Sequence, residues 1–294
     1  MVSVRTFSIV AADPESGACG VAVASKFLAA GAVVPWARAG VGAIATQSHA
    51  NTRYGPEGLA LLAEGVAPDE AVQRLIHADP EASKRQIGIV DMRGGAATFS
   101  GGDCFRWYGG LTAVNVAVQG NILVSEETVA AMLQAFQDTP GALAWRLLAG
   151  LKAGDRAGGD RRGKQSAALL VVKPSGGYGG FNDRHLDLRV DDHLQPVDEL
   201  ERLASVWRLY FEEPAESDPV VIDDELATEL RQGLRQLGYD PGPTAGPWGE
   251  PAQRAFTAFA EMENLEDRVR ADGRTDQQVL AYFRELRRRR SALG

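Results

Sequence analysis

Apolar residues follow two patterns along the chain, one typical of strands and one typical of helices. Short runs of small and β-branched residues, bounded by Gly, Pro, Asp or Ser, predict strands. These runs cover residues 7–12, 19–25, 41–46, 86–91, 96–100, 113–119, 166–173 and 186–190. The segment DPESG separates the first two runs, and its turn-forming residues predict a β-hairpin.

Apolar residues at helical spacing predict five helices in the first two thirds of the chain. They cover residues 56–64, 68–78, 125–136, 142–152 and 196–211. Strands and helices therefore come in groups, without the regular alternation of a doubly wound parallel sheet. We expect an α+β fold, a layered sandwich in which two sheets lie face to face with helices outside.

A change in composition marks the end of this first domain. Residues 212–222, EEPAESDPVVI, are polar and carry two prolines, so we expect a linker between domains at 1–211 and 223–294. Beyond it, helical spacing predicts three helices at 223–237, 251–262 and 275–289. The second domain is therefore expected to be small and all-α.

The composition of the chain indicates which ligands and partner molecules to expect. With 39 acidic and 31 basic residues the net charge is −8, so we expect no nucleic-acid partner. The two cysteines give no metal-ligand spacing, and DLRVDDH matches neither an EF-hand nor a zinc helix, so no metal or cofactor is expected. We find no membrane-spanning apolar run and no signal peptide, and expect a cytoplasmic protein without a membrane partner.

The first candidate for chemistry is Thr6, at the head of the first strand. A threonine at a free N-terminus combines a hydroxyl nucleophile with an α-amine whose pKa is about 8. An ordinary strand threonine is the alternative. Ser25 and Lys26 end the second strand, beside Thr6 if the hairpin pairs as expected. Lys26 could keep a neighbouring group basic or bind a carboxylate; a solvated lysine is the alternative.

Polar residues at other strand ends suit a ligand-facing rim or plain turns. Gln47, His49 and Asn51 follow the run at 41–46. Gly120 and Asn121 lie between a strand and a helix, where backbone N–H groups and an amide can stabilise an oxyanion. A tight turn explains the same two residues.

The densest polar cluster follows Gly158 and Gly159, and its members are Asp160, Arg161, Arg162, Gln165 and Ser166. An arginine in this cluster could bind a substrate carboxylate in a bidentate fork. An Asp–Arg network that only holds the loop is the alternative. The sequence GGDRRG does not match a phosphate-binding loop.

Several motifs occur in one order over about residues 5–210: TFSIVAADPESGACGVAVASKF, GAVVPWARAGVGAIATQ, RYGPEGL, RQIGIVD, VQGNIL, AGGDRRGKQSAAL and DLRVDDH. Together they resemble a bacterial and archaeal family, catalogued as a domain of unknown function and grouped with the N-terminal nucleophile (Ntn) hydrolases. The resemblance implies a four-layer αββα sandwich, descent from amide-bond hydrolases and a homodimer.

The resemblance also implies roles for the candidate residues. Thr6 falls at the position of the nucleophile, and Ser25 with Lys26 near that of a helper lysine. With Thr6 as nucleophile, the oxyanion hole is expected at Gly120 and Asn121. The residues expected to bind a small amide or peptide-like substrate are Ser25, Gln47, His49, Asn51, Asp160, Arg161, Gln165 and Ser166. Because residues 2–5 precede Thr6, activation requires cleavage after Arg5. The alternative is a non-catalytic ligand-binding protein on the same fold.

A second resemblance covers about residues 223–290. The segment LRQGLRQLGYDPGPTAGPWGEPAQRAFTAFAEMENLEDR is similar to a small three-helix peptidoglycan-binding module. The matching residues are Leu234, Leu237, Gly238, Tyr239, Gly242, Gly246, Trp248, Ala255 and Phe259. The resemblance implies peptidoglycan fragments as a partner of this domain.

Overall fold

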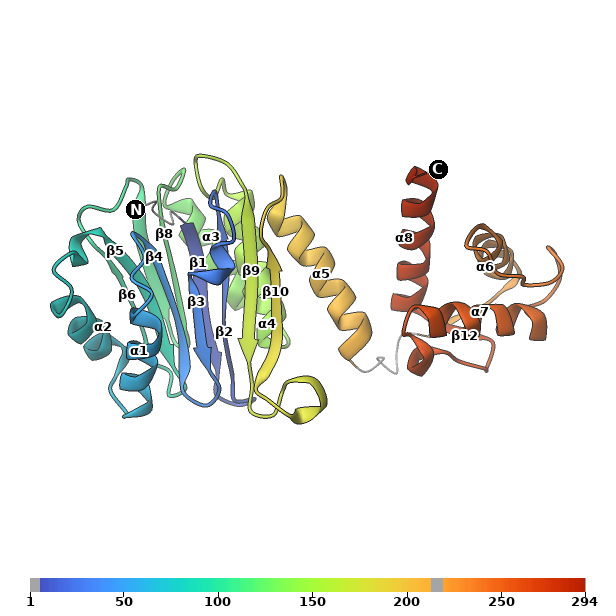
Figure 1. The fold of residues 1–294 in the computed structure, drawn as a ribbon, viewed down its shortest axis with the longest axis horizontal. Helices are drawn as coiled ribbons and strands as arrows, with labels where there is room; N and C mark the ends of the chain where they lie inside the picture. The colour runs from blue at the N-terminus through green and yellow to red at the C-terminus, as the bar shows by residue number, and fades with distance from the viewer. Residues whose placement is uncertain (1–5, 213–218, 294) are drawn as a thin grey trace. The chain divides into compact units, whose positions relative to one another are not determined.

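The computed structural model describes residues 6–212 and 219–293, and the chain divides into two compact units (Figure 1). Unit 1 is Met1–Arg202 and unit 2 is Leu203–Gly294. Helices and strands occur in both units, so the predicted α+β class is confirmed.

Unit 1 contains two antiparallel sheets, one of six strands and one of four. The six-stranded sheet has the order β10-β9-β2-β1-β8-β7, and the four-stranded sheet β3-β4-β5-β6. The larger sheet comprises β1 (Thr6–Asp13), β2 (Ala18–Ser25), β7 (Tyr108–Ala113), β8 (Val116–Asn121), β9 (Ser166–Val172) and β10 (Arg184–Val190). The smaller comprises β3 (Pro35–Arg38), β4 (Gly42–Ser48), β5 (Arg85–Asp91) and β6 (Ala96–Ser100).

Two pairs of helices cover the outer faces of the sheets (Figure 1). The helices α1 (Tyr54–Ala63) and α2 (Pro68–His77) share a core with the four-stranded sheet. The helices α3 (Glu127–Asp138) and α4 (Leu143–Arg156) pack together, and α4 contacts β1 and β2. The longer α5 (Pro196–Phe211) follows β10, and its range is the one that the sequence predicts.

Alternation along β1 shows which side chains fill the space between the sheets. Val10 and Ala12 belong to a core that also contains Ala43 and Val90 of the four-stranded sheet. The intervening Ile9 faces α4, where a Cβ built on Gly150 would lie 3.1 Å from its Cδ1. Because successive strand residues point to opposite faces, even-numbered residues of β1 face the other sheet. Helices, sheet, sheet and helices therefore follow one another in unit 1.

Unit 2 packs three helices around an aromatic core. They are α6 (Asp224–Gln236), α7 (Glu250–Met262) and α8 (Gln277–Leu293). Phe256, Phe259 and Phe283 lie at the centre of this core. A short two-stranded sheet, β11 (Pro219–Val221) with β12 (Arg274–Asp276), is added to the predicted helices.

Besides the unpredicted strand β3, the following features differ from the sequence-based expectations. Residues 219–221, predicted as linker, form β11 because Val220 packs against the core of unit 2; residues 213–218 lie outside the described residues. The strand predicted at 113–119 is β8, and β7, which the sequence pattern does not predict, precedes it; a turn at Val114 and Asn115 joins the two into a hairpin. Asn115 has a φ of 65°, a left-handed conformation that asparagine tolerates well.

Candidate functional site

Polar residues line up across neighbouring strands at one end of the six-stranded sheet. Thr6 pairs with Ser25, and Ser25 pairs with Ser166 on β9. Phe7 of β1 pairs with Gly120 of β8, and the same register places the preceding residue, Thr6, opposite Asn121. Since directly paired residues of antiparallel strands share a face, the four side chains project toward the four-stranded sheet. The predicted neighbourhood of Thr6 and Ser25 is thus present.

Five buried side chains connect the two sheets beside this row, and we call them the amide layer: Ser8, Gln47, Gln86, Gln119 and Asn121. Each is 0% exposed. Gln119 Nε2 donates to Ser8 Oγ over 2.7 Å, and Ser8 Oγ donates to Gln47 Oε1, also over 2.7 Å. Gln47 Nε2 and Asn121 Nδ2 both donate to Gln86 Oε1 over 2.8 Å. The layer is therefore a continuous hydrogen-bonded network.

The amide layer holds Thr6 in place. Gln47 Nε2 donates to the Thr6 carbonyl oxygen over 3.3 Å, and the Thr6 hydroxyl donates to Ser25 Oγ over 3.1 Å. Within the described part of the chain, two oxygens of the layer accept no hydrogen bond: Gln119 Oε1 and Asn121 Oδ1. A buried acceptor without a donor costs about 1–3 kcal/mol, so a group that donates a hydrogen bond to either oxygen would recover this free energy.

Backbone strain gathers where strands end near this row. Ala29 follows β2 with a φ of 53°, Ser48 ends β4 with 68°, and Ile122 follows β8 with 55°. Left-handed backbone is unfavourable for residues other than glycine, above all for a β-branched isoleucine. Such strain often marks a functional site, because only the surrounding structure can maintain it.

Lys26 and Asp160 interact with each other rather than with Thr6. The Lys26 backbone N–H donates to Asp160 Oδ2 over 3.1 Å, whereas the Lys26 side chain is exposed. Lys26 Nζ donates to the carbonyl oxygen of Lys164 over 3.3 Å. The buried Asp160 carboxylate also accepts from Arg162 Nε over 3.0 Å. The acid–base contacts here match the loop-holding alternative.

The other residues of this cluster separate into exposed and structural ones. Arg161 is exposed, and its backbone N–H donates to the Ile122 carbonyl oxygen over 3.1 Å. Gln165 Nε2 donates to Asp192 Oδ1 over 3.1 Å. Ser166 Oγ donates to the Phe27 carbonyl oxygen over 2.6 Å, and so fixes the loop that follows β2.

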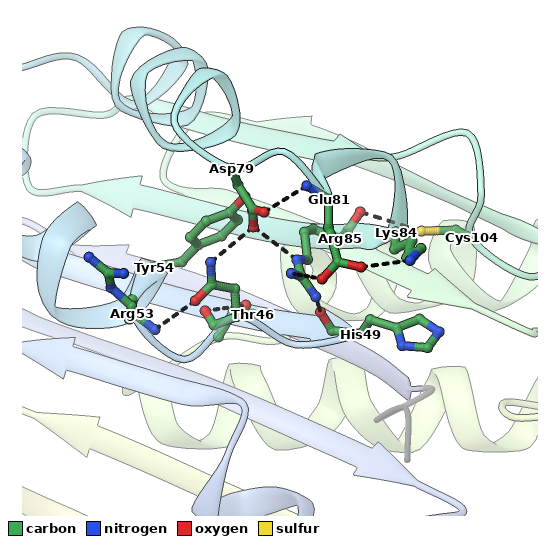
Figure 2. Close-up of polar contacts among 10 residues, drawn as sticks. Thr46, His49, Arg53, Tyr54, Asp79, Glu81, Lys84, Arg85 and Cys104 are labelled. Carbon is green, nitrogen blue, oxygen red and sulfur yellow. Dashed lines mark hydrogen bonds and ion pairs between the residues drawn. The ribbon is translucent and has the colours of Figure 1, made fainter. Parts of the chain in front are cut away.

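His49 and Asn51 belong to a different polar cluster, centred on Asp79 (Figure 2). Asn51 Nδ2, Arg85 Nε and Tyr54 Oη donate to Asp79 Oδ2 over 2.9, 2.9 and 3.0 Å. Arg85 also donates to the His49 carbonyl oxygen. Burial alone would raise the pKa of Asp79, but these hydrogen bonds outweigh it and hold the pKa well below its usual value. The cluster fixes the loop after β4.

Sequence reasoning missed Ser8, Gln86 and Gln119 as members of the site. Ser8 and Gln119 are polar residues within apolar stretches of β1 and β8, a signal that is visible in the sequence. Gln86 follows Arg85 at the start of β5, so the same signal is absent there. Their meeting between the sheets depends on which strand faces which, and this is a long-range property of the fold.

Metal and thiol chemistry find little support in the described parts of the chain. No group of three or more His, Cys, Asp or Glu side chains there could hold a metal ion. In DLRVDDH, Asp191 pairs with Arg189. Burial raises the pKa of the Cys19 thiol to about 12, which keeps it protonated. No helix among the described residues is long and apolar enough to cross a bilayer.

Comparison with known proteins gives the family of each part. Residues 6–200 match a model described as "Family of unknown function (DUF1028)". The chain belongs to the DUF1028 family. Residues 210–283 match a second model, described as "Putative peptidoglycan binding domain". Both family resemblances predicted from the sequence are thereby confirmed.

A solved DUF1028 structure is similar to this chain. It is the crystal structure of protein SPO2555 from Silicibacter pomeroyi, with 33% sequence identity and a TM-score of 0.64. The alignment covers 69% of this chain and 86% of that one. No curated protein matches the chain. The DUF1028 matches name a family and no reaction.

Proposed function

We propose that this DUF1028 protein is an Ntn-type amidohydrolase that cleaves a small amide or peptide-like substrate, with Thr6 as the nucleophile. The observation that supports it is the position of Thr6. It is the first residue of β1, faces the space between the sheets, and donates its hydroxyl hydrogen to Ser25. The succession of helices, sheet, sheet and helices in unit 1 is the order that an Ntn relationship requires.

The proposed reaction begins when a chain starts at Thr6, after hydrolysis of the bond to Arg5. The freed α-amine takes the hydroxyl proton while Oγ1 attacks the substrate carbonyl carbon. The C–N bond of the tetrahedral intermediate then breaks, the leaving amine takes that proton, and an acyl ester of Thr6 remains. Water hydrolyses the ester, with the α-amine again as base, and releases a carboxylic acid.

The neighbours of Thr6 suit supporting roles in this reaction. Ser25 Oγ accepts from Oγ1 and fixes the direction of the hydroxyl. Asn121 Nδ2 uses one hydrogen toward Gln86 and keeps a second that can stabilise the oxyanion. Gly120 lies inside β8 and pairs with Phe7 on one side and Gly109 on the other, so its backbone belongs to the sheet ladder. We therefore assign the oxyanion donor to the Asn121 side chain.

The test uses a shortened variant in which Met1 directly precedes Thr6, so that removal of methionine exposes the threonine. A β-lactone serves as probe, because a nucleophilic hydroxyl opens its ring and retains the whole molecule as an ester. We expect one adduct per chain, located at Thr6 by peptide mass spectrometry. The full chain is analysed in parallel by intact mass, where we expect a species that begins at Thr6.

Two substitutions in the shortened variant act as controls. Thr6→Ala should abolish the adduct, and Thr6→Ser should keep it, since serine retains the hydroxyl and the amine. If the folded variant that begins at Thr6 forms no adduct and cleaves no member of a panel of aminoacyl anilides, the proposal is wrong.

A second candidate function is ligand binding without catalysis on the same fold. Two observations favour it: Thr6 is 0% exposed, and Lys26 Nζ is engaged by a backbone carbonyl at Lys164. An unprocessed chain whose thermal stability rises with a small amide, without turnover of that amide, is the expected result. Hydrolysis that disappears in Thr6→Ala would exclude this candidate.

A further inference from the structure

Unit 2 carries an open groove between α6, α8 and β11. Its volume is about 380 Å³. The lining residues are Val220, Val221, Asp223, Glu225, Leu226, Glu229, Gln277, Leu280, Ala281 and Arg284. The groove is therefore built from one compact unit, and it does not depend on the function proposed for Thr6.

The floor and one wall of the groove are apolar. Leu226 and Leu280 reach it from the core of unit 2, where they are 8% and 4% exposed. Val221 on β11 is 60% exposed, which is high for a branched apolar side chain. Ala281 adds a small side chain on α8. Small apolar groups of a ligand would gain free energy by covering this surface.

The charges in the groove do not cancel. Arg284 neutralises Glu229 in a bidentate ion pair: its Nε and Nη2 donate to the two carboxylate oxygens over 2.8 and 2.6 Å. Asp223 accepts from the Leu226 N–H at the start of α6, a bond that leaves its negative charge in place. Among the described residues, neither Asp223 nor Glu225 forms an ion pair. The groove thus combines one closed ion pair with two exposed carboxylates at the start of α6, which the helix dipole stabilises and no cationic side chain pairs with among the described residues.

We propose that this groove binds a short peptide through a side-chain amine. The ammonium group lies beside Glu225 and Asp223, and small apolar side chains of the peptide cover Leu226, Leu280 and Ala281. Charge complementarity selects a cationic ligand, because two unpaired carboxylates repel an anionic one. The lining contains no aromatic ring on which a sugar could stack, so a peptide fits it better than a glycan.

The test is isothermal titration of the full chain with N-acetyl-Ala-Lys-Ala-amide. We expect this cationic tripeptide to bind, and its Nε-acetyl-lysine analogue to bind at least tenfold more weakly because it lacks the ammonium group. Glu225→Gln should weaken binding of the cationic peptide about tenfold, or about 1.4 kcal/mol. Ala281→Trp fills the groove and should abolish binding.

A matched control removes the same charge elsewhere in unit 2. Glu261 is exposed on α7 and lies outside the groove, so Glu261→Gln should bind like the wild-type chain. Circular dichroism confirms that each variant is folded. Equal affinity for the two peptides, absence of binding at millimolar concentration, or full binding by folded Ala281→Trp would each overturn the proposal.

Discussion

Asp79 receives hydrogen bonds from side chains on three separate segments, although it is a single residue in a loop (Figure 2). Its side chain is 8% exposed and that of its partner Arg85 is 11% exposed, so the pair is largely shielded from water. Burial and the neighbouring carboxylate also raise the pKa of Tyr54, which therefore stays a neutral donor. Removing the carboxylate charge would leave the buried Arg85 guanidinium with Glu81, a more exposed carboxylate, as its remaining ion-pair partner.

We predict that Asp79→Asn lowers the free energy of unfolding by about 1–3 kcal/mol at pH 7, because Glu81 still pairs with Arg85. Urea denaturation measures this change. As a control, Glu64→Gln removes a carboxylate that is exposed at the end of α1, and it should change stability by less than about 0.5 kcal/mol. Equal stability of Asp79→Asn and the wild type would show that the pair contributes nothing.

The pKa of Asp79 also predicts how the difference in unfolding free energy between the wild type and Asp79→Asn depends on pH. Its pKa is lower in the folded state than in the unfolded state, so its contribution is complete above the unfolded value of about 3.9. The contribution is lost as the pH falls through the lower folded value. The stability gap between wild type and Asp79→Asn should therefore shrink below about pH 4, which denaturation at a series of pH values measures.

Some contacts around Thr6 can be predicted from the sequence and others cannot. The difference is whether a local turn or the packing of the two sheets brings the contacting residues together. The pairing of Thr6 with Ser25 follows from a local hairpin turn, and the structure confirms it. The bond between Gln47 and Gln86 joins adjacent strands, whereas the bond from Ser8 to Gln47 crosses between sheets. Only the packing of one sheet on the other creates that last contact.

At the scale of elements, local signals predict the buried segments best. The ranges of β6 and α5 agree with the expectations, because a Gly-Gly turn precedes β6, Gly101 follows it, and Pro196 begins the helical spacing of α5. The strands β3 and β7 were missed, since β3 has only four residues and two glycines follow Tyr108 at the start of β7. Neither carries the alternation that an amphipathic strand shows.

Packing of α1 on the four-stranded sheet depends on a glycine. A Cβ built on Gly55 would lie 2.1 Å from the Trp36 ring. We predict that Gly55→Ala lowers the free energy of unfolding by about 1–3 kcal/mol, although alanine favours helix formation. Gly102 has open space around it, so Gly102→Ala should be nearly neutral. Thermal melts of the two variants compare them; a neutral Gly55→Ala would contradict the prediction.

At the scale of the molecule, each unit has an apolar core of its own. Phe259 lies in the core of unit 2, and Met132 is fully buried in unit 1. We predict that Phe259→Ala costs about 3–5 kcal/mol and Met132→Ala about 2–5 kcal/mol, each within its own unit. Hydrogen exchange of peptides from both units measures this. Equal loss of protection in both units from either substitution would contradict the prediction.

The amide layer has a consequence for how the two sheets of unit 1 are aligned. Apolar faces can slide over one another with little change in contact, but an amide has its donors and acceptors at fixed positions. Sliding one sheet by a single residue pair, about 6.6 Å, would separate Ser8 from Gln47 and Gln86 from Asn121. The hydrogen bonds of the amide layer therefore form at only one alignment of the two sheets. Any shifted packing would lose all of these hydrogen bonds at once.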